Sequence, residues 1–441
     1  MRTTLAGIAV LVALNCPAAA QDIKIGFLGT FTGPLSAAGG DMRDAAELAL
    51  DKMGRKMGGR PVSVIYEDDQ LKPDVGKQKT EKLIQSDRVD LLTGYLSSAV
   101  LLASIKTVAD AQIILVGANA GPSQIAGELC TPWFFSTSWQ GDQVPQAIGE
   151  YMNQKGVKSA FLIAPNYAAG KDVLAGVKAN YKGNVVGEEY TRWPDQLDFS
   201  AELTKARTTK PDAVFAFYPG AAGVQFMTQY AQAGLKGQIP LYTAFIIDAL
   251  SLPRLKDLAV GVPSAQHWGP DLPNEANKTF VKDFETKHSR TPSFYASQAY
   301  DAINLIASAV SAVKGDVSKK DEMRAEMKKA NYASVRGPYK YGNNHFPIQN
   351  FYLQEPVKTG DELRAEDRRD SACRASGPLS RTLSDEVMLK QQWPRRCPGH
   401  CMSKDIKTSK TISRPGKSAR AAHGAPGPPP RASRSDGLPG A

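Results

Sequence analysis

Two short loops rich in small and hydroxyl-bearing residues are the strongest candidates for chemistry in this chain of 441 residues. The first, G-Y-L-S-S-A at residues 94–99, follows an apolar run and precedes a helix predicted over residues 100–111. The hydroxyls of Ser97 and Ser98, together with the free N–H groups at a helix start, can hold a carboxylate through hydrogen bonds and the helix dipole. Ordinary serine capping of that helix is the alternative interpretation.

The second loop, G-A-N-A-G-P at residues 117–122, follows the next apolar run. Its small side chains would let a ligand approach the backbone closely, although a plain turn explains them equally well. In an open α/β sheet, loops at the carboxyl ends of the strands face the ligand crevice. We therefore expect both loops to lie at one binding edge.

Signatures of enzymatic chemistry are absent from the sequence. It contains no H-E-x-x-H, G-x-S-x-G or paired C-x-x-C motif. Residues 166–171 resemble the end of a P-loop, but Pro165 stands where that motif requires its first glycine. Three histidines are scattered through the body without metal-ligand spacing: His267, His288 and His345. We expect no catalytic residues, no metal site and no cofactor.

The elements that must position these loops alternate along the chain. Apolar, β-rich runs are separated by amphipathic stretches, which predicts right-handed βαβ units and a parallel sheet. The runs are residues 23–28, 62–66, 91–96, 113–117, 160–164, 185–190, 213–218 and 239–243. The segment 131–138 interrupts the rhythm after four runs, so two lobes fit better than one eight-stranded barrel. A long helix near residues 294–313 and β-like segments at 337–341 and 348–353 close the body.

Both ends of the chain differ from this body. Residues 1–20 have a basic start, an apolar stretch and small residues before Gln21, which is the pattern of a cleavable export signal. Residues 356–441 contain 17 of the 54 Lys and Arg residues and 9 of the 44 Asp and Glu residues. The remaining chain is nearly neutral and has no footprint for nucleic acid.

The segment 356–441 is rich in Pro, Gly, Ser and Arg and lacks hydrophobic periodicity, so we expect it to be disordered and to make no contribution to a binding cleft. It is either a natural flexible tail or a frameshifted end. Cys130 is the lone cysteine of the body, and one of the tail cysteines could capture it in a disulfide. The tail cysteines are Cys373, Cys397 and Cys401.

From residue 22 to residue 355 the chain resembles the periplasmic branched-chain amino-acid (Leu/Ile/Val)-binding proteins of ABC importers. The matching stretches are D-I-K-I-G-F-L-G-T-F-T-G-P-L at 22–35, G-Y-L-S-S at 94–98, G-A-N-A-G-P at 117–122, Y-A-Q-A-G-L at 230–235, P-S-F-Y-A-S-Q-A-Y-D-A at 292–302 and V-R-G-P-Y at 335–339. The resemblance implies an α/β fold of the type I periplasmic binding protein class, with two Rossmann-like lobes joined by three crossovers and a ligand cleft between them. We place lobe I at residues 21–138 and 268–343, and lobe II at residues 139–267 and 344–355.

The resemblance also implies a set of ligand-binding residues. Ser98, with Ser97 beside it, matches the carboxylate-binding serine of the family. Ala118 matches a residue whose backbone helps to hold the ligand, and Ala120 stands where amino-acid binders usually have threonine. The other expected members are Asn119, Tyr167, Tyr218, Phe245 and Tyr295. For each aromatic residue, ordinary core packing is the alternative.

One departure from the family pattern concerns the ligand's ammonium group. Amino-acid binders place an acidic residue after the strand that ends here near Phe245, and that residue pairs with the ammonium. A buried ammonium without a carboxylate partner is strongly penalised. Asp248 could compensate if the loop shifts. The aromatic residues expected near the cleft favour an aromatic acid, such as benzoate or a phenylpropanoid derivative, and otherwise a branched-chain amino acid.

We therefore predict a monomeric, non-catalytic, periplasmic solute-binding protein. It would capture a small carboxylate by hinge closure and deliver it to the permease subunits of an ABC importer. A periplasmic sensor of the same fold that presents its ligand to a receptor is an alternative. A secreted α/β hydrolase is a further alternative, but it would need a Ser/His/Asp set that the sequence does not offer.

Overall fold

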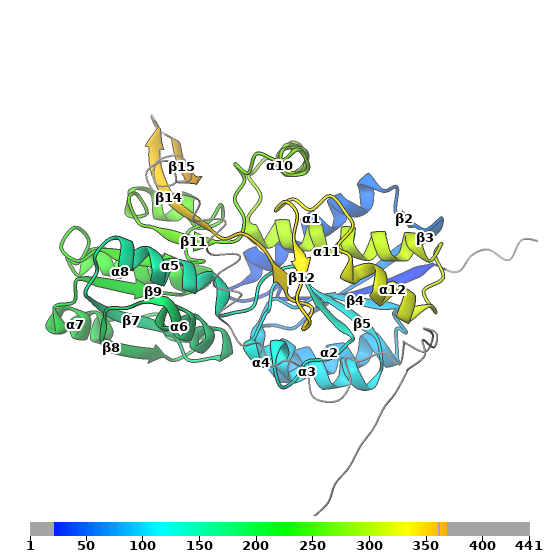
Figure 1. Ribbon diagram of the computed structural model, residues 1–441, viewed down its shortest axis with the longest axis horizontal. Coiled ribbons are helices and arrows are strands. Elements are labelled where there is room, and N and C mark those ends of the chain that lie inside the picture. The colour runs from blue at the N-terminus through cyan, green and yellow to red at the C-terminus, as the bar shows by residue number, and fades with distance from the viewer. Residues whose placement is uncertain (1–21, 360–361, 368–441) are drawn as a thin grey trace, which may run out of the picture. The chain divides into compact units, whose positions relative to one another are not determined.

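The computed structural model describes residues 22–359 and 362–367, which all belong to one compact unit of the chain and form two α/β lobes (Figure 1). The first lobe is built on a six-stranded sheet of order β2-β3-β1-β4-β5-β6. Its strands are β1 (Ile23–Gly29), β2 (Lys56–Met57), β3 (Arg60–Asp68), β4 (Leu91–Gly94), β5 (Ile114–Gly117) and β6 (Phe134–Ser136). Of these strands only β2 runs antiparallel to its neighbour.

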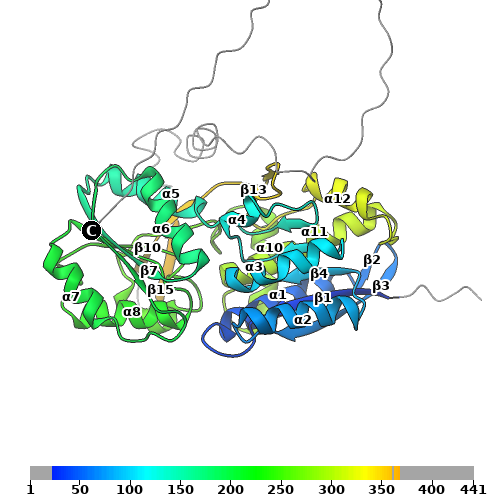
Figure 2. The ribbon, with the colours of Figure 1, turned by 90° about the horizontal axis from the view of Figure 1, so that it is seen from below.

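Helices cover both faces of this first sheet. Successive side chains of its strands point to opposite faces, and both faces are apolar. Ile25 and Phe27 of β1 face the side covered by α1 (Ser36–Lys52) and α11 (Phe294–Ala312), which pack on each other. Leu28 faces the other side, where α2 (Pro73–Gln85) and α3 (Ser98–Asp110) lie side by side (Figure 2). The remaining helices of this lobe are α4 (Ser123–Ala126), α10 (Glu275–His288) and α12 (Lys320–Lys328).

The second lobe is built on a seven-stranded sheet of order β15-β14-β11-β10-β9-β7-β8. Its strands are β7 (Ser159–Pro165), β8 (Asn184–Thr191), β9 (Ala213–Ala216), β10 (Leu241–Ala244), β11 (Ser264–Gln266), β14 (Tyr352–Thr359) and β15 (Glu362–Asp367). The strands β11, β10, β9, β7 and β8 are parallel to one another. The strands β14 and β15 are antiparallel to their neighbours and lie at one edge of the sheet. The helices of this lobe are α5 (Gln143–Gln154), α6 (Ala168–Asn180), α7 (Ser200–Thr209), α8 (Ala221–Gln232), α9 (Leu252–Leu255) and the 3₁₀ turn η1 (Lys256–Leu258).

This architecture confirms the predicted doubly lobed α/β fold with parallel sheets. Four strands were not expected. β6 lies in the segment 131–138, which interrupts the predicted alternation, β2 and β11 lie in stretches with no predicted strand, and β15 lies in the expected tail. β2, β6 and β11 have only two or three residues each, too few for a periodic pattern to emerge.

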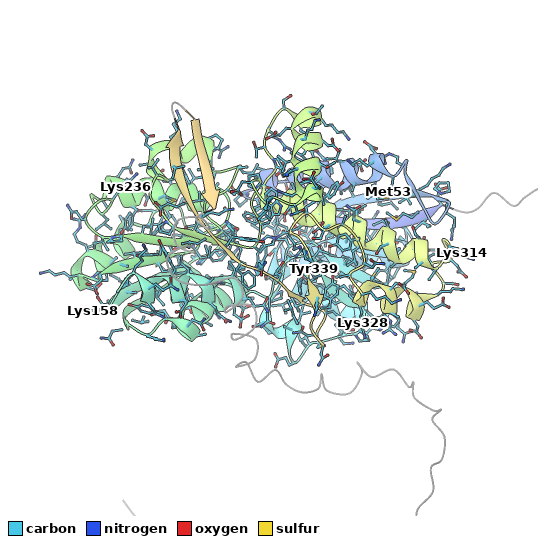
Figure 3. All side chains as sticks on the ribbon, turned by 45° about the horizontal axis from the view of Figure 1, so that its top comes forward. Met53, Lys158, Lys236, Lys314, Lys328 and Tyr339 are labelled. Atoms are coloured by element: carbon cyan, nitrogen blue, oxygen red, sulfur yellow. The ribbon has the colours of Figure 1, made fainter. Side chains whose placement is uncertain are left out.

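The chain passes between the two sheets three times, and Arg336 ties two of these passages to the first lobe. Its Nη1 donates to the carbonyl oxygen of Ser138 at 3.0 Å and to Gln349 Oε1 at 2.9 Å. Its Nε donates to the buried carboxylate of Asp301 at 3.2 Å. The guanidinium also lies 4.8 Å from the ring centroid of Tyr339, which is labelled in Figure 3. The crossovers are therefore anchored on α11 by a buried, hydrogen-bonded ion pair.

The third passage departs from the expected lobe boundary at residues 343–344. His345 and Phe346 still pack on the first lobe: Ser136 N donates to the His345 carbonyl oxygen at 3.0 Å, and the ring centroids of Phe346 and Phe134 are 5.5 Å apart. The short strands β12 (Lys340–Tyr341) and β13 (Pro347–Ile348) form a separate antiparallel pair. The chain joins the second sheet only at Tyr352.

The expected start of the disordered tail, at Pro356, falls inside β14. That strand continues to Thr359 and pairs with β15 in an antiparallel hairpin, so the second sheet extends past the expected boundary. The predicted export signal at residues 1–20 and the segment 368–441 lie outside the described residues. None of the helices within the described ranges combines the length and the apolarity that a membrane span requires.

Candidate functional site

A small cavity lies where the carboxyl ends of the strands of the two lobes face each other. Its walls come from the loops after β1, β3, β4 and β5 in the first lobe, and from the loops after β7, β8, β9 and β10 in the second. The start of α11 and the first crossover complete the walls. The volume is about 50 Å³. An apolar cavity that accepts a benzene ring measures about 150 Å³, so the cavity must widen to admit an aromatic ligand.

The first lobe presents the N-terminus of α3 to this cavity. Ser97 precedes the helix and Ser98 begins it; both line the cavity, and no side chain caps the helix. The first turn contains no acidic residue. Because the first N–H groups of a helix have no intrahelical acceptor, this end offers donors to an anion. The alternative of ordinary capping does not hold here, because the Ser97 side chain makes no capping bond.

The turn that brings Ser97 to the cavity is conformationally unusual. Gly94 and Tyr95 both have positive φ, of 95° and 62°. A Cβ atom at residue 94 would lie 2.2 Å from the carbonyl oxygen of Leu28, so only glycine fits there. Tyr95 is held by its backbone N–H, which donates to the same oxygen at 2.7 Å, and by its hydroxyl, which lies 2.7 Å from Thr80 Oγ1. A bulky residue with positive φ is strained, and such strain clusters at functional sites.

Helix N-termini from the second lobe also meet the cavity. Tyr167 precedes α6, and Pro219 lies just before α8; both line the cavity, and neither helix carries a side-chain cap or an acidic residue in its first turn. The first two residues of α11 in the first lobe, Phe294 and Tyr295, line it as well, but the Ser293 side chain caps that helix by accepting from Ala296 N. Each helix N-terminus carries roughly half a positive charge, so the uncapped ends of α3, α6 and α8 favour an anion in the cavity without any cationic side chain.

Aromatic rings form most of the remaining wall, in stacked pairs. The rings of Trp139 and Phe245 are 4.4 Å apart and nearly parallel, at 18°. Tyr167 stacks on Trp193 at 5.2 Å and 15°. Burial raises the pKa of Tyr167 and of Tyr295, so both phenols stay neutral and can donate hydrogen bonds.

No acidic, basic or histidine side chain is among the described residues that line the cavity. Asp248 does not supply the missing carboxylate. Its Oδ1 accepts from the backbone N–H groups of Leu250, at 3.0 Å, and Ser251, at 2.8 Å, and the residue lines a separate, open groove. Within the described part of the chain, no group of three or more His, Cys, Asp or Glu side chains is arranged to hold a metal ion.

The structure brings seven of the nine expected site residues together around the cavity. They are Ser97, Ser98, Asn119, Ala120, Tyr167, Phe245 and Tyr295. Ala118 is fully buried beside it, where its N–H donates to the Gly94 carbonyl oxygen at 2.8 Å.

Tyr218 lies on the other side of its strand end and does not reach the cavity. Its hydroxyl is 3.0 Å from Thr191 Oγ1, and its ring stacks on Phe226 within the core of the second lobe. Side chains alternate across an extended chain, so its neighbours Phe217 and Pro219 face the cavity instead. Core packing, the alternative stated for each aromatic residue, is therefore correct for Tyr218.

Four large aromatic residues of the wall were not anticipated: Trp139, Trp193, Phe217 and Phe294. Phe217 adjoins the expected Tyr218. Trp193 could have been found by the rule used for the serine loop, because it follows the carboxyl end of β8. Phe294 adjoins the expected Tyr295. Trp139 carried no such signal, because β6, which precedes it, was not predicted.

The two lobes touch on both sides of the cavity. Asp172 of α6 reaches Ser123 of α4: Ser123 Oγ donates to Oδ1 at 2.6 Å, and Ser123 N donates to Oδ2 at 2.8 Å. Burial raises the pKa of Asp172, and its bonds with Ser123 partly offset that effect. On another side, a Cβ atom at Gly220 would lie 2.6 Å from Leu35 Cδ2. These contacts and the small cavity describe a closed arrangement of the lobes.

Comparison with known proteins agrees with this geometry. A family model described as "Periplasmic binding protein" matches residues 22–361. The chain is 28% identical to Leu/Ile/Val-binding protein homolog 6 of Brucella melitensis, over 82% of this chain and 94% of that protein.

Two solved structures are similar in both sequence and fold. One is the solute-binding protein of an ABC transporter from R. palustris in complex with benzoate, at 34% identity and a TM-score of 0.75, covering 79% of this chain and 96% of that one. The other is a solute-binding protein from Rhodopseudomonas palustris BisB5 in complex with 3,4-dihydroxybenzoic acid, at 29% identity and a TM-score of 0.74, covering 78% and 96%.

Proposed function

This chain belongs to the periplasmic binding protein family and is a solute-binding protein of an ABC transporter, and from that premise we propose that its ligand is an aromatic carboxylate. The carboxylate would lie at the N-terminus of α3, against Ser97 and Ser98. The ring would lie between the aromatic walls contributed by the two lobes.

The observation that carries this proposal is the absence of charged side chains among the described residues of the cavity wall. An amino acid would have to bury its ammonium group there without a carboxylate partner, which costs several kcal/mol or more. A carboxylate needs only neutral donors, and helix N-termini with free N–H groups supply them. The benzoate and dihydroxybenzoate held by the two similar solute-binding proteins support this choice.

A branched-chain amino acid is the second candidate, favoured by the Leu/Ile/Val-binding relatives. Phe245 counts against it, because its ring occupies the wall where the resemblance places an acidic residue and stacks there on Trp139. We also propose that the protein has no catalytic role: neither serine of the cavity has a histidine or a carboxylate in the described wall to activate it.

Capture would follow the opening and closing of the lobes. An open state admits the ligand, and closure excludes water and brings both aromatic walls onto the ring. We propose that the protein works as a monomer in the periplasm, after export directed by residues 1–20, and that it delivers its ligand to permease subunits. A sensor that presents the ligand to a receptor would use the same cavity.

Thermal unfolding of the purified protein with matched ligands tests the proposed ligand class. Benzoate at about a hundred times its dissociation constant should add about 2.7 kcal/mol of stability. Benzamide keeps the shape without the charge and should bind more weakly. Benzylamine carries the opposite charge and should not bind. Stabilisation by leucine or valine, with none by benzoate, would overturn the proposal.

A further inference from the structure

Asn119 carries a side-chain oxygen that the protein leaves without a partner. The residue follows β5 and lines the cavity. Its Nδ2 donates to the carbonyl oxygen of Leu96 at 2.7 Å. This bond fixes the orientation of the amide, so Oδ1 is the side-chain atom that is left to accept a hydrogen bond. Among the described residues, Oδ1 has no hydrogen-bond partner, and the atom is buried.

This oxygen sits beside the carboxylate-binding loop but has the wrong chemistry for a carboxylate. Leu96, which accepts the bond from Asn119, directly precedes Ser97. A carboxylate is an acceptor only, and the amide oxygen is an acceptor as well, so the two cannot bond to each other. An unsubstituted aromatic acid therefore leaves Oδ1 buried and unpaired, which lowers its affinity.

We propose that Asn119 Oδ1 accepts a hydrogen bond from a hydroxyl group of the ligand, and that Asn119 thereby selects hydroxy-substituted aromatic acids over unsubstituted ones. This inference rests on the proposed function and names a specificity-determining residue within it. A ligand ammonium could also donate to Oδ1, but one neutral amide does not offset the burial of a full charge. A neutral hydroxyl satisfies the oxygen without that penalty.

Calorimetric titration of the full chain tests the inference with three sets of ligands: benzoate, the 2-, 3- and 4-hydroxybenzoates, and the corresponding fluorobenzoates. Fluorine has a size close to that of a hydroxyl but cannot donate. We expect at least one hydroxybenzoate to bind about tenfold more tightly than benzoate and than its fluoro counterpart, the gain expected from one buried neutral hydrogen bond.

The variant Asn119→Leu replaces the amide with an apolar group of similar shape. It should lose the hydroxyl preference, because the acceptor Oδ1 is gone. It also removes the donor to the Leu96 carbonyl oxygen, so the readout is the ratio of the hydroxybenzoate and benzoate affinities within the variant and not the affinity for benzoate itself. Asn119→Ala should also lose the preference, and it serves if the leucine variant does not fold. Ser98→Ala is the control. It should lower the affinities for benzoate and for hydroxybenzoate by the same factor and leave the ratio of the two affinities unchanged.

The inference fails if the wild type binds benzoate as tightly as every hydroxybenzoate, or if the preference survives in both Asn119 variants. Either result leaves the proposed function standing, because aromatic acids still bind. If no aromatic acid binds the wild type at all, the proposed function itself fails, and the inference with it.

Discussion

Ser98 combines two donors at one point of the cavity wall, its own hydroxyl and the N–H groups of the helix that it begins. The side chain is only 4% exposed. A hydrogen bond formed there with a ligand carboxylate would be well shielded from water. The contribution of this residue to binding should therefore be larger than that of a surface hydroxyl.

Replacement of Ser98 by alanine should weaken the binding of benzoate by about 1.5–3 kcal/mol, which is the range for a hydrogen bond to a charged group. Titration calorimetry measures the change directly. Ser86→Ala, on an exposed position at the end of α2, is the matched control and should leave affinity unaltered. Equal affinities of the Ser98 variant and the control would return Ser98 to a structural role.

At this scale the sequence predicted loops better than side-chain directions. Ser97, Ser98 and Asn119 were found because small or polar residues directly after an apolar run must lie at the carboxyl edge of a parallel sheet. Tyr218 was misplaced because the exact register of the strand end decides which of two neighbours faces inward. That register is a tertiary property, and the sequence around residue 218 is apolar on both sides.

Among the elements, α4 and α6 hold the two lobes together across the cavity through the Asp172–Ser123 contact, which we call the interlobe latch. Asp172 is 7% exposed, and both of its carboxylate oxygens accept bonds from Ser123. The latch joins one element of each lobe. It can form only while the lobes are closed, and it should therefore slow their opening.

Replacement of Asp172 by alanine should raise the ligand dissociation rate by about tenfold or more, because two bonds to a charged acceptor are lost from the closed state alone. Trp139 and Trp193 line the cavity, so stopped-flow fluorescence can follow release. Lys171→Ala, on the adjacent exposed position of α6, is the control. An unchanged dissociation rate would show that the latch does not retain the ligand.

The alternation of strands and helices was predictable because buried parallel strands read as continuous apolar runs and the helices between them are amphipathic. The hairpin of β14 and β15 was not. Residues 362–367, E-L-R-A-E-D, contain four charged side chains and no apolar run, so nothing local marks them as a strand. Their pairing with β14 is what defines them.

For the whole molecule, Asp69 links folding to pH. Its Oδ1 accepts from Thr30 Oγ1 at 2.7 Å and from Leu71 N at 2.8 Å, which joins the loops after β1 and β3. Burial raises its pKa to about 6, the neighbouring Asp68 carboxylate adds to that rise, and the two hydrogen bonds reduce it. The carboxyl group is fully buried in the folded protein.

Because the pKa of Asp69 is higher in the folded state than in the unfolded state, where it is about 3.9, its contribution to stability is fully present below about pH 4. That contribution is lost as the pH rises through about 6, and the loss amounts to about 3 kcal/mol. The substitution Asp69→Asn would keep the acceptor oxygen and remove the titrating group. The unfolding free energy of the wild type minus that of Asp69→Asn should therefore fall between pH 4 and pH 7.

Chemical denaturation at a series of pH values measures this difference. Asp74→Asn, on an exposed position of α2, is the control and should leave the pH profile of the wild type unchanged. If the difference in unfolding free energy between the wild type and Asp69→Asn stays constant from pH 4 to pH 7, the pH dependence does not come from Asp69.

The division into two lobes was predictable from the chain as a whole, because apolar runs fell into two groups. The points where the chain changes lobe were harder, since they depend on single contacts. Residues 345 and 346 stay with the first lobe through a backbone bond to Ser136 and a ring contact with Phe134. Neither contact leaves a mark in the local sequence.

The uncharged wall of the cavity has a further consequence, for the conditions under which the protein can work. Mobile salt ions weaken attraction between exposed charges over about 10 Å, but they act little on groups shielded from solvent. In the proposed site the attraction would come from backbone dipoles inside a closed cavity, since the described wall carries no charged side chain. The affinity should thus depend little on ionic strength. In a compartment whose salt concentration varies with that of the medium outside the cell, the protein would bind its ligand equally well at low and at high salt.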